Sequence, residues 1–137
     1  MPVTYQIDVE RKLIRTTATG PITPKDVINH FWALARDPQF PERPDVFLDV
    51  SGVESVPNGQ QLSVVVGEMK RIGAKLRFGS CAILASRDVL FGMMRMFEAM
   101  AEDFFTETCT FRDATEAELW LASRQSLADP KPSDRDE

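Results

Sequence analysis

Residues 45–62 read DVFLDVSGVESVPNGQQL, and this stretch decides the fold. Its beginning, Asp45 to Val50, is an apolar run that is too short for a helix and is bounded by turn signals, so it predicts a strand. After the loop, apolar residues recur every three or four positions and predict a helix: Leu62, Val65, Val66, Met69 and Ile72. A strand that leads through a loop into a helix is the building unit of a parallel sheet.

The chain before this unit predicts a hairpin followed by a helix. Residues 5–9 alternate between apolar and polar, and residues 13–19 are rich in β-branched side chains, which is typical of two strands. Thr23-Pro24-Lys25-Asp26 has the form of a helix start, with threonine as N-cap and proline at the first helical position. The core face of this helix is expected at Val27, Ile28, Phe31, Leu34 and Ala35.

The chain after the unit repeats the same alternation of strand and helix. Ser80 to Ala85 is a continuous apolar run, consistent with a strand that is buried on both faces. Ser86 is expected to cap a helix that runs to about Asp103, and residues 108–111 form a last strand. Asp113-Ala114-Thr115-Glu116 has the form of a capping box and predicts a fourth helix.

The order of elements is therefore ββαβαβαβα, which predicts a single α/β domain. Strands that alternate with helices are expected to be parallel and to be joined by right-handed crossovers, while the hairpin adds an antiparallel edge. We expect a mixed, mostly parallel sheet of about five strands over residues 1–127, with helices packed on it. Residues 128–137 read ADPKPSDRDE and are expected to form a disordered tail.

Composition excludes several classes of function. The net charge of −5 argues against a binder of nucleic acid, which needs a basic face. No stretch approaches the roughly 18 uncharged apolar residues of a membrane span, and no secretory signal is visible. Cys81 and Cys109 lie in separate strand-like stretches, so free thiols in a reducing compartment are favoured over a disulfide between two strands. These patterns indicate a cytoplasmic protein.

Catalytic and metal-binding patterns are missing from the sequence. It contains no P-loop, no Gly-x-Ser-x-Gly and no pair of histidines at metal-ligand spacing. The single histidine, His30, lies at the border of the first helix's core face and is expected to be structural. An enzyme would need polar groups converging near Asp49, His30 and Arg87. We therefore predict no enzymatic activity, no cofactor and no metal.

Several stretches along the chain carry a resemblance to a known family. They are Leu13-Ile14-Arg15 through Gly20, the Thr23-x-x-Asp26 helix start, Phe47-Leu48-Asp49-Val50-Ser51, Phe91-Gly92-x-x-Arg95-Met96-Phe97-Glu98, and Phe111 with Glu116-Ala117 and Trp120-Leu121. In their order and spacing, over roughly residues 4–122, they resemble STAS domains, the fold of bacterial anti-sigma-factor antagonists. The similarity is closer to the small stand-alone "SpoIIAA-like" branch. The resemblance implies a bacterial regulatory protein that acts through protein–protein contacts.

The loop after Asp49 departs from the pattern of phosphoregulated STAS proteins. Those proteins carry Asp-Ser-Ser-Gly there, and a kinase phosphorylates one serine at the helix N-terminus. Here Val56-Pro57-Asn58-Gly59 stands in that place, so the phosphoacceptor serine is missing. Ser51 and Ser55 lie earlier in the loop, off the motif. Asp49 is expected to accept hydrogen bonds from the backbone N–H groups of residues 52–53, and Asn58 with Gly59 to begin the helix.

The helix expected after Ser86 has more apolar surface than a surface helix needs. Its apolar residues cover about half of the circumference, against the ~100° stripe of an ordinary amphipathic helix. The candidate interaction or ligand surface consists of Phe91, Met93, Met94, Met96, Phe97 and Met100. Phe91 projects into the polar side and is expected to be exposed in a monomer. Sheet and neighbouring helices, a protein partner or an apolar ligand are the alternatives that would cover this face.

Two functional hypotheses follow. The first is a non-enzymatic regulatory or protein-interaction module of STAS-like type, acting as a homodimer or with another protein. The second is a binder or carrier of a small apolar molecule or lipid, which predicts a cavity between the methionine-rich helix and the sheet. The second hypothesis rests on the architectural likeness of STAS-like folds to lipid-binding α/β domains.

Overall fold

The computed structural model describes residues 2–128 of the chain, and this range contains one five-stranded sheet, four α-helices and a short 3-10 helix. The elements are β1 Val3–Asp8, β2 Leu13–Gly20, α1 Pro24–Arg36, β3 Asp45–Val53, α2 Gly59–Ile72, β4 Phe78–Leu84, α3 Asp88–Met100, η1 Glu102–Phe104, β5 Phe105–Phe111 and α4 Ala114–Ala128. The strands lie in the order β1-β2-β3-β4-β5. β1 is antiparallel to β2, and the other pairs are parallel. The predicted order and the mixed sheet are confirmed.

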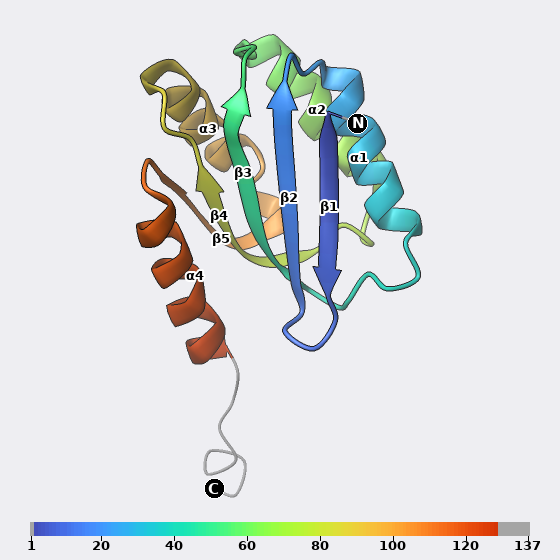
Figure 1. Ribbon diagram of the computed structural model, residues 1–137. Coiled ribbons are helices and arrows are strands. Elements are labelled where there is room, and N and C mark those ends of the chain that lie inside the picture. Colours follow the sequence, from blue (N-terminus) through green and yellow to red (C-terminus); the bar gives the residue numbers. More distant parts are fainter. Residues whose placement is uncertain (1, 129–137) are drawn as a thin grey trace, which may run out of the picture.

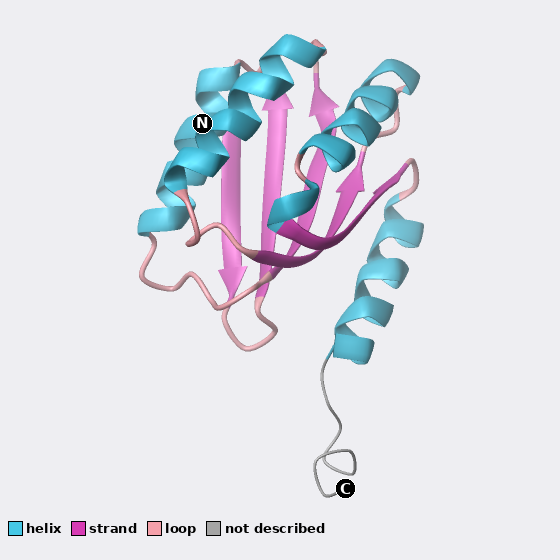
Figure 2. Cartoon of the chain, turned by 180° about the vertical axis from the view of Figure 1, so that it is seen from behind, coloured by secondary structure: helices cyan, strands magenta, loops and turns pink. Residues whose placement is uncertain are grey.

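The helices cover the sheet unequally. Figures 1 and 2 show α1, α2 and α3 on one face and α4 alone on the other. Successive strand residues point to opposite faces, so Ile14 and Thr16 of β2 lie beneath α1–α3 while Leu13 packs with the residues of α4. We call the first side the cavity face, because a cavity lies there, and the second the α4 face.

Two predicted helix starts are confirmed in detail. At α1, Thr23 accepts a hydrogen bond from the backbone N–H of Asp26, whose carboxylate accepts from the N–H of Thr23. At α2, Asn58 and Gln61 form the same reciprocal pair. Such boxes satisfy amides that have no partner inside the helix. They fix the residues at which α1 and α2 begin, after the connections that follow β2 and β3.

Several boundaries differ from the sequence prediction: β3 runs to Val53 rather than Val50, and β4 spans Phe78–Leu84 rather than Ser80–Ala85. Ser86 does not cap α3; the N-cap is Arg87, without a side-chain cap, and the helix ends at Met100 rather than near Asp103. β5 begins at Phe105, three residues early, because Phe105 pairs with Phe78 of β4 and their rings stack at 5.0 Å. Tertiary pairing thus extends a strand beyond its local signal.

The predicted C-terminal tail lies almost entirely outside the described residues. Residues 129–137 of the expected tail lie outside the described residues, and Ala128 still belongs to α4. Within residues 2–128, no helix has the length and apolar character needed to cross a membrane.

Cys81 and Cys109 are both free thiols, the first buried and the second half-buried, so the alternative of a disulfide is wrong.

Candidate functional site

An apolar cavity of about 140 Å³ lies between the sheet and helices α1, α2 and α3. Its floor is formed by the inward side chains of the two central strands, which include Thr16 and Ala18 of β2 and Val46, Leu48 and Val50 of β3. The helices supply the walls. Their residues are Val27, His30, Phe31 and Leu34 of α1, Gln61, Leu62 and Val65 of α2, and Leu90, Met94 and Phe97 of α3.

The cavity has a physical cause in the residues of its floor. Four of the five floor positions named above carry short side chains: alanine, threonine or valine. Protein interiors normally pack as densely as organic crystals, with few voids larger than a water molecule. Short side chains beneath three long helices leave space that Leu34, Phe97 and their neighbours do not fill. Leu48 is only half-buried in the middle of the sheet, as expected for a side chain that borders open space.

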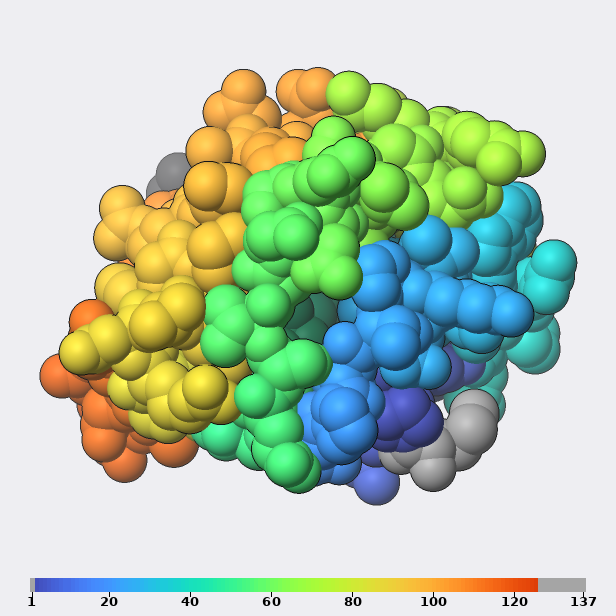
Figure 3. Space-filling model, turned by 90° about the horizontal axis from the view of Figure 1, so that it is seen from above, coloured from blue at the N-terminus to red at the C-terminus, as the bar shows by residue number. Residues whose placement is uncertain are grey.

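The cavity opens at the end of the sheet where β2 and β3 terminate. Viewed from that end, the molecule shows a hollow between the β2–α1 connection (blue) and the segment that follows β3 (green) (Figure 3). Ile22, Thr23 and Pro24 line one side of it, and Val53, Ser55 and Pro57 line the other. Ligands of open α/β sheets commonly bind at this end of the strands.

Hydrogen bonds tie the two sides of this mouth together. The Ser55 hydroxyl accepts a hydrogen bond from the Ile22 amide at 2.8 Å and donates one to the Ile22 carbonyl at 3.0 Å. The Glu54 amide donates to the Gly20 carbonyl at 2.9 Å. Arg87 at the start of α3 donates to the Val53 carbonyl at 3.0 Å. The segment after β3 is therefore fixed to both its neighbours.

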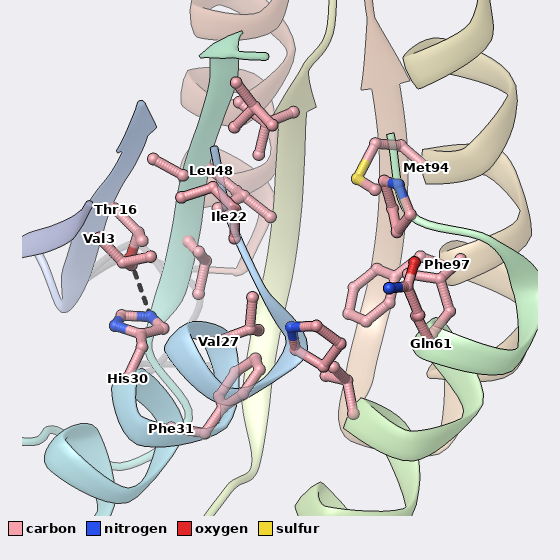
Figure 4. A pocket seen from close by; sticks show the side chains of 18 of the residues that line it. Val3, Thr16, Ile22, Val27, His30, Phe31, Leu48, Gln61, Met94 and Phe97 are labelled. Carbon is pink, nitrogen blue, oxygen red and sulfur yellow. Dashed lines mark hydrogen bonds between the residues drawn. The ribbon is translucent and has the colours of Figure 1, made fainter. Parts of the chain in front are cut away.

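One corner of the apolar wall is polar. In Figure 4, His30 of α1 points toward Thr16 of β2, while Met94, Phe97 and Gln61 lie across the cavity from them. The His30 Nε2 lies 3.5 Å from the Thr16 hydroxyl. The ring also packs against Tyr5 and Phe31, with centroid separations of 5.5 and 5.3 Å. Burial lowers the pKa of His30 to about 4, so the imidazole is neutral near pH 7.

The loop residues singled out from the sequence divide between the two faces of the sheet. Asp49 and Ser51 lie on the α4 face, away from the cavity. Asp49 accepts hydrogen bonds from the Ser51 amide at 2.9 Å and from its hydroxyl at 2.6 Å, not from residues 52–53 as expected. Ser55 belongs to the mouth of the cavity. Asn58 caps α2, and Gly59 lies against the sulfur of Met96.

The six residues of the methionine-rich surface also separate. Met94 and Phe97 are buried and line the cavity. Met93 and Met100 are partly buried and pack against the main core. Met96 is exposed, with 44% of its surface accessible. The sheet and the neighbouring helices therefore cover most of this apolar surface. Two of its side chains, Met94 and Phe97, also border the cavity.

The exposure expected for Phe91 is wrong. Phe91 is half-buried and packs against the main core. The Arg112 guanidinium lies over its ring, 4.3 Å from the centroid, and pairs with Asp88 at the start of α3. A guanidinium over an aromatic face is a favourable contact. The side chain is thus covered within one copy of the chain.

Sequence reasoning missed Thr16 and undervalued His30. A signal for Thr16 was available, because the inward positions of β2 read Ile14, Thr16 and Ala18, and a hydroxyl interrupts that apolar row. Thr16 is only 2% exposed. His30 was placed correctly at the border of the helix's core face, but nothing on its own helix indicates that β2 brings a hydroxyl beside it.

The polar groups that an enzyme would need do not converge. His30 lines the cavity, Asp49 lies on the opposite face of the sheet, and the Arg87 guanidinium is bound to a backbone carbonyl. Among residues 2–128, no group of three His, Cys, Asp or Glu side chains is placed to hold a metal ion. Burial raises the pKa of the Cys81 thiol in the cavity wall, which disfavours the reactive thiolate.

Comparisons with known proteins give structural likenesses but no match in sequence. No family model matches the chain, and no curated protein matches it in sequence. The fold is similar to that in the crystal structure of an anti-sigma factor antagonist from Mycobacterium paratuberculosis, with a TM-score of 0.48 and 14% sequence identity, over 88% of this chain and 94% of that chain.

Proposed function

We propose that this chain is a non-enzymatic module of STAS-like type that binds a small apolar molecule between its sheet and helices α1–α3. One observation carries the proposal: the cavity of about 140 Å³ is walled almost entirely by apolar side chains and opens to the surface between two loops. Binding sites for small molecules are typically concave, apolar and supplied with a few polar groups.

The energetics support an occupant. At about 24 cal/mol per Å³, a closed and empty cavity of this size would cost about 3 kcal/mol of unfolding free energy, which sets an upper bound for this open one. That is a large part of the 5–15 kcal/mol that stabilises a typical domain. Larger side chains at floor positions such as Ala18 would remove the cost. An apolar ligand regains contacts with the walls and stabilises the folded state by mass action.

The mouth of the cavity supports a regulatory role. The segment from Val53 to Gly59 is the loop that, by the resemblance, corresponds to the phosphorylated loop of STAS proteins. Here it lacks the phosphoacceptor at the expected position, and it borders the cavity instead through Val53, Ser55 and Pro57. Ligand occupancy, in place of a phosphate, would then alter the surface that a protein partner contacts.

Native mass spectrometry of the full chain tests ligand binding. We expect the protein to retain a small molecule, or to take up added toluene, and Ala18→Leu to abolish both by filling the floor. Ala33→Leu, the same change at an exposed position of α1, is the matched control and should bind normally. If wild-type protein neither retains a molecule nor binds toluene, the proposed function is wrong.

Self-association is the second candidate, and exposed apolar residues on the helices favour it. Val89 and Met96 of α3 are 63% and 44% exposed, and Val64 of α2 is 54% exposed. We expect sedimentation equilibrium to detect a dimer that Met96→Asp weakens. Leu119→Asp on α4, an apolar position that is 66% exposed, serves as the control and should leave the dimer unchanged. A strict monomer at all concentrations would contradict this candidate.

A further inference from the structure

A buried hydroxyl in the cavity wall is the starting point. Thr16 lies in the middle of β2, between Tyr5 of β1 and Leu48 of β3, and is 2% exposed. In the part of the chain that the structure describes, its only side-chain contact of hydrogen-bond type is with His30 Nε2, at 3.5 Å. This distance is at the long limit for a hydrogen bond. A buried hydroxyl normally has a full partner, because leaving it without one costs free energy.

His30 offers the complementary half of the pair. Tyr5 and Phe31 hold its ring from two sides, and the Tyr5 hydroxyl is itself engaged by Asp37 at 2.7 Å. The imidazole is neutral, so its two nitrogens supply one donor and one acceptor. A hydroxyl placed beside Thr16 and His30 therefore finds both a donor and an acceptor, without any charge. Among the described residues that line the cavity, none is a lysine or an arginine that could pair with an anion.

The size of the cavity limits the rest of the ligand. An engineered cavity of about 150 Å³ lined by Leu, Ile and Phe binds benzene, so a space of this volume takes about six to ten non-hydrogen atoms. On the opposite wall, Phe97 and Met94 supply apolar and aromatic surface, and the Gln61 side-chain oxygen beside them is already engaged by the Asn58 amide. Ring-sized molecules match these walls, because sulfur and aromatic side chains contact ring edges and faces favourably.

We propose that the His30–Thr16 pair selects a neutral, ring-sized apolar molecule that carries one hydroxyl group, with phenol as its simplest form. The inference rests on the proposed function, since it names the chemistry of the molecule in the same cavity. The ring occupies the apolar space, and the hydroxyl bridges Thr16 and His30 in place of their long contact. A carboxylate is rejected, because burying an unpaired charge costs far more than a hydrogen bond returns.

Calorimetric titration with phenol, toluene and benzoate tests the proposal on the full chain. We expect phenol to bind about three- to tenfold more tightly than toluene, the range given by one neutral hydrogen bond. Benzoate should show no detectable binding. Thr16→Val removes the hydroxyl with little change of shape, and should equalise phenol and toluene. Thr17→Val, the next residue on the opposite face of β2, should keep the preference.

Nitrogen NMR of the imidazole adds a readout that needs no variant. The chain has one histidine, so its ring signals are assigned without ambiguity. Phenol should shift the His30 Nε2 resonance, and toluene should shift it much less. Equal binding of phenol and toluene, or no difference between their nitrogen shifts, would overturn the inference and leave the proposed function standing. Failure of both compounds to bind would instead contradict the proposed function.

Discussion

The two faces of the sheet are built from the same strands and are packed differently. On the α4 face, six residues that are at most 8% exposed form one cluster: Leu13, Phe47, Ala82, Leu84, Ala117 and Leu121. None of these six lines the cavity. On this side α4 contacts the sheet through Ala117 and Leu121. The small alanine side chain lets the helix approach closely enough to leave no hollow. On the cavity face, three helices share a floor of short side chains and leave a hollow. The face with more helices is therefore the less completely filled one.

The largest effect expected from this difference comes from two leucine-to-alanine changes. Leu121→Ala on the α4 face should lower the free energy of unfolding by about 3 kcal/mol, because it empties a filled site. Leu48→Ala on the cavity face should cost only about 1 kcal/mol, since its side chain already borders open space. Urea denaturation measures both. Equal costs would show that the cavity face is as tightly packed as the α4 face.

Replacement of an alanine by leucine should give the second-largest difference in stability between the two faces. Ala82→Leu on the α4 face is expected to destabilise the domain by about 2 kcal/mol, because the added atoms have no space. Ala18→Leu, also on a strand but on the cavity floor, should leave stability unchanged or raise it slightly. Thermal unfolding of the two variants beside wild type provides the comparison. A large loss of stability in Ala18→Leu would argue against an open cavity.

Acid should weaken the cavity face through His30. The folded-state pKa of about 4 lies below the ordinary value of 6.5, so between these values the unfolded chain binds the extra proton. Stability contributed by the neutral ring is therefore complete above about pH 6.5 and is lost as the pH falls toward 4, by about 3 kcal/mol. Unfolding of His30→Gln across this range should lack that component. An unchanged pH profile in the variant would contradict the assignment.

The smallest effect concerns a surface pair on the α4 face. Arg15 of β2 donates two hydrogen bonds of 2.9 Å to Glu118 of α4, and its guanidinium lies 5.1 Å from the centroid of the Phe47 ring. Both charged side chains are close to half exposed. Glu118→Gln should therefore cost about 0.5 kcal/mol, and less in high salt. A loss of several kcal/mol would mean that α4 is held mainly by charge.

The arrangement of elements could be predicted from local patterns. Alternation in the hairpin, the apolar run that begins at Asp45 and the helix starts at Thr23 and Asn58 depend on residues close in sequence, and these elements were confirmed. Prediction was wrong at the start of β5, where Phe105 takes its partner from β4. It was also wrong for Phe91, which is covered by an arginine 21 positions later. Both errors concern contacts between distant segments.

The cavity was anticipated in its place but not in its composition. The width of the apolar face on α3 suggested a space beside Met94 and Phe97. The volume of a cavity, however, depends on the spacing of several elements and on the size of the side chains that fill the space between them. The pattern of one element therefore does not predict it. The polar corner combines Thr16 of β2 with His30 of α1. Because these residues lie on different elements, neither strand nor helix periodicity predicts that they are neighbours. Ser55, which lies off the phosphorylation motif, is hydrogen-bonded to Ile22, 33 residues away, and no local pattern indicates this contact.

The double hydrogen bond of Ser55 has a consequence for exchange rates. Because one hydroxyl holds both the amide and the carbonyl of Ile22, the two loops at the mouth must separate together or not at all. The width of the opening into the cavity is therefore set by one side chain, and loss of that hydroxyl should let the two loops move apart. Faster exchange of the backbone amide hydrogen of Ile22 in Ser55→Ala than in the wild-type protein would be the measurable sign of that loosening.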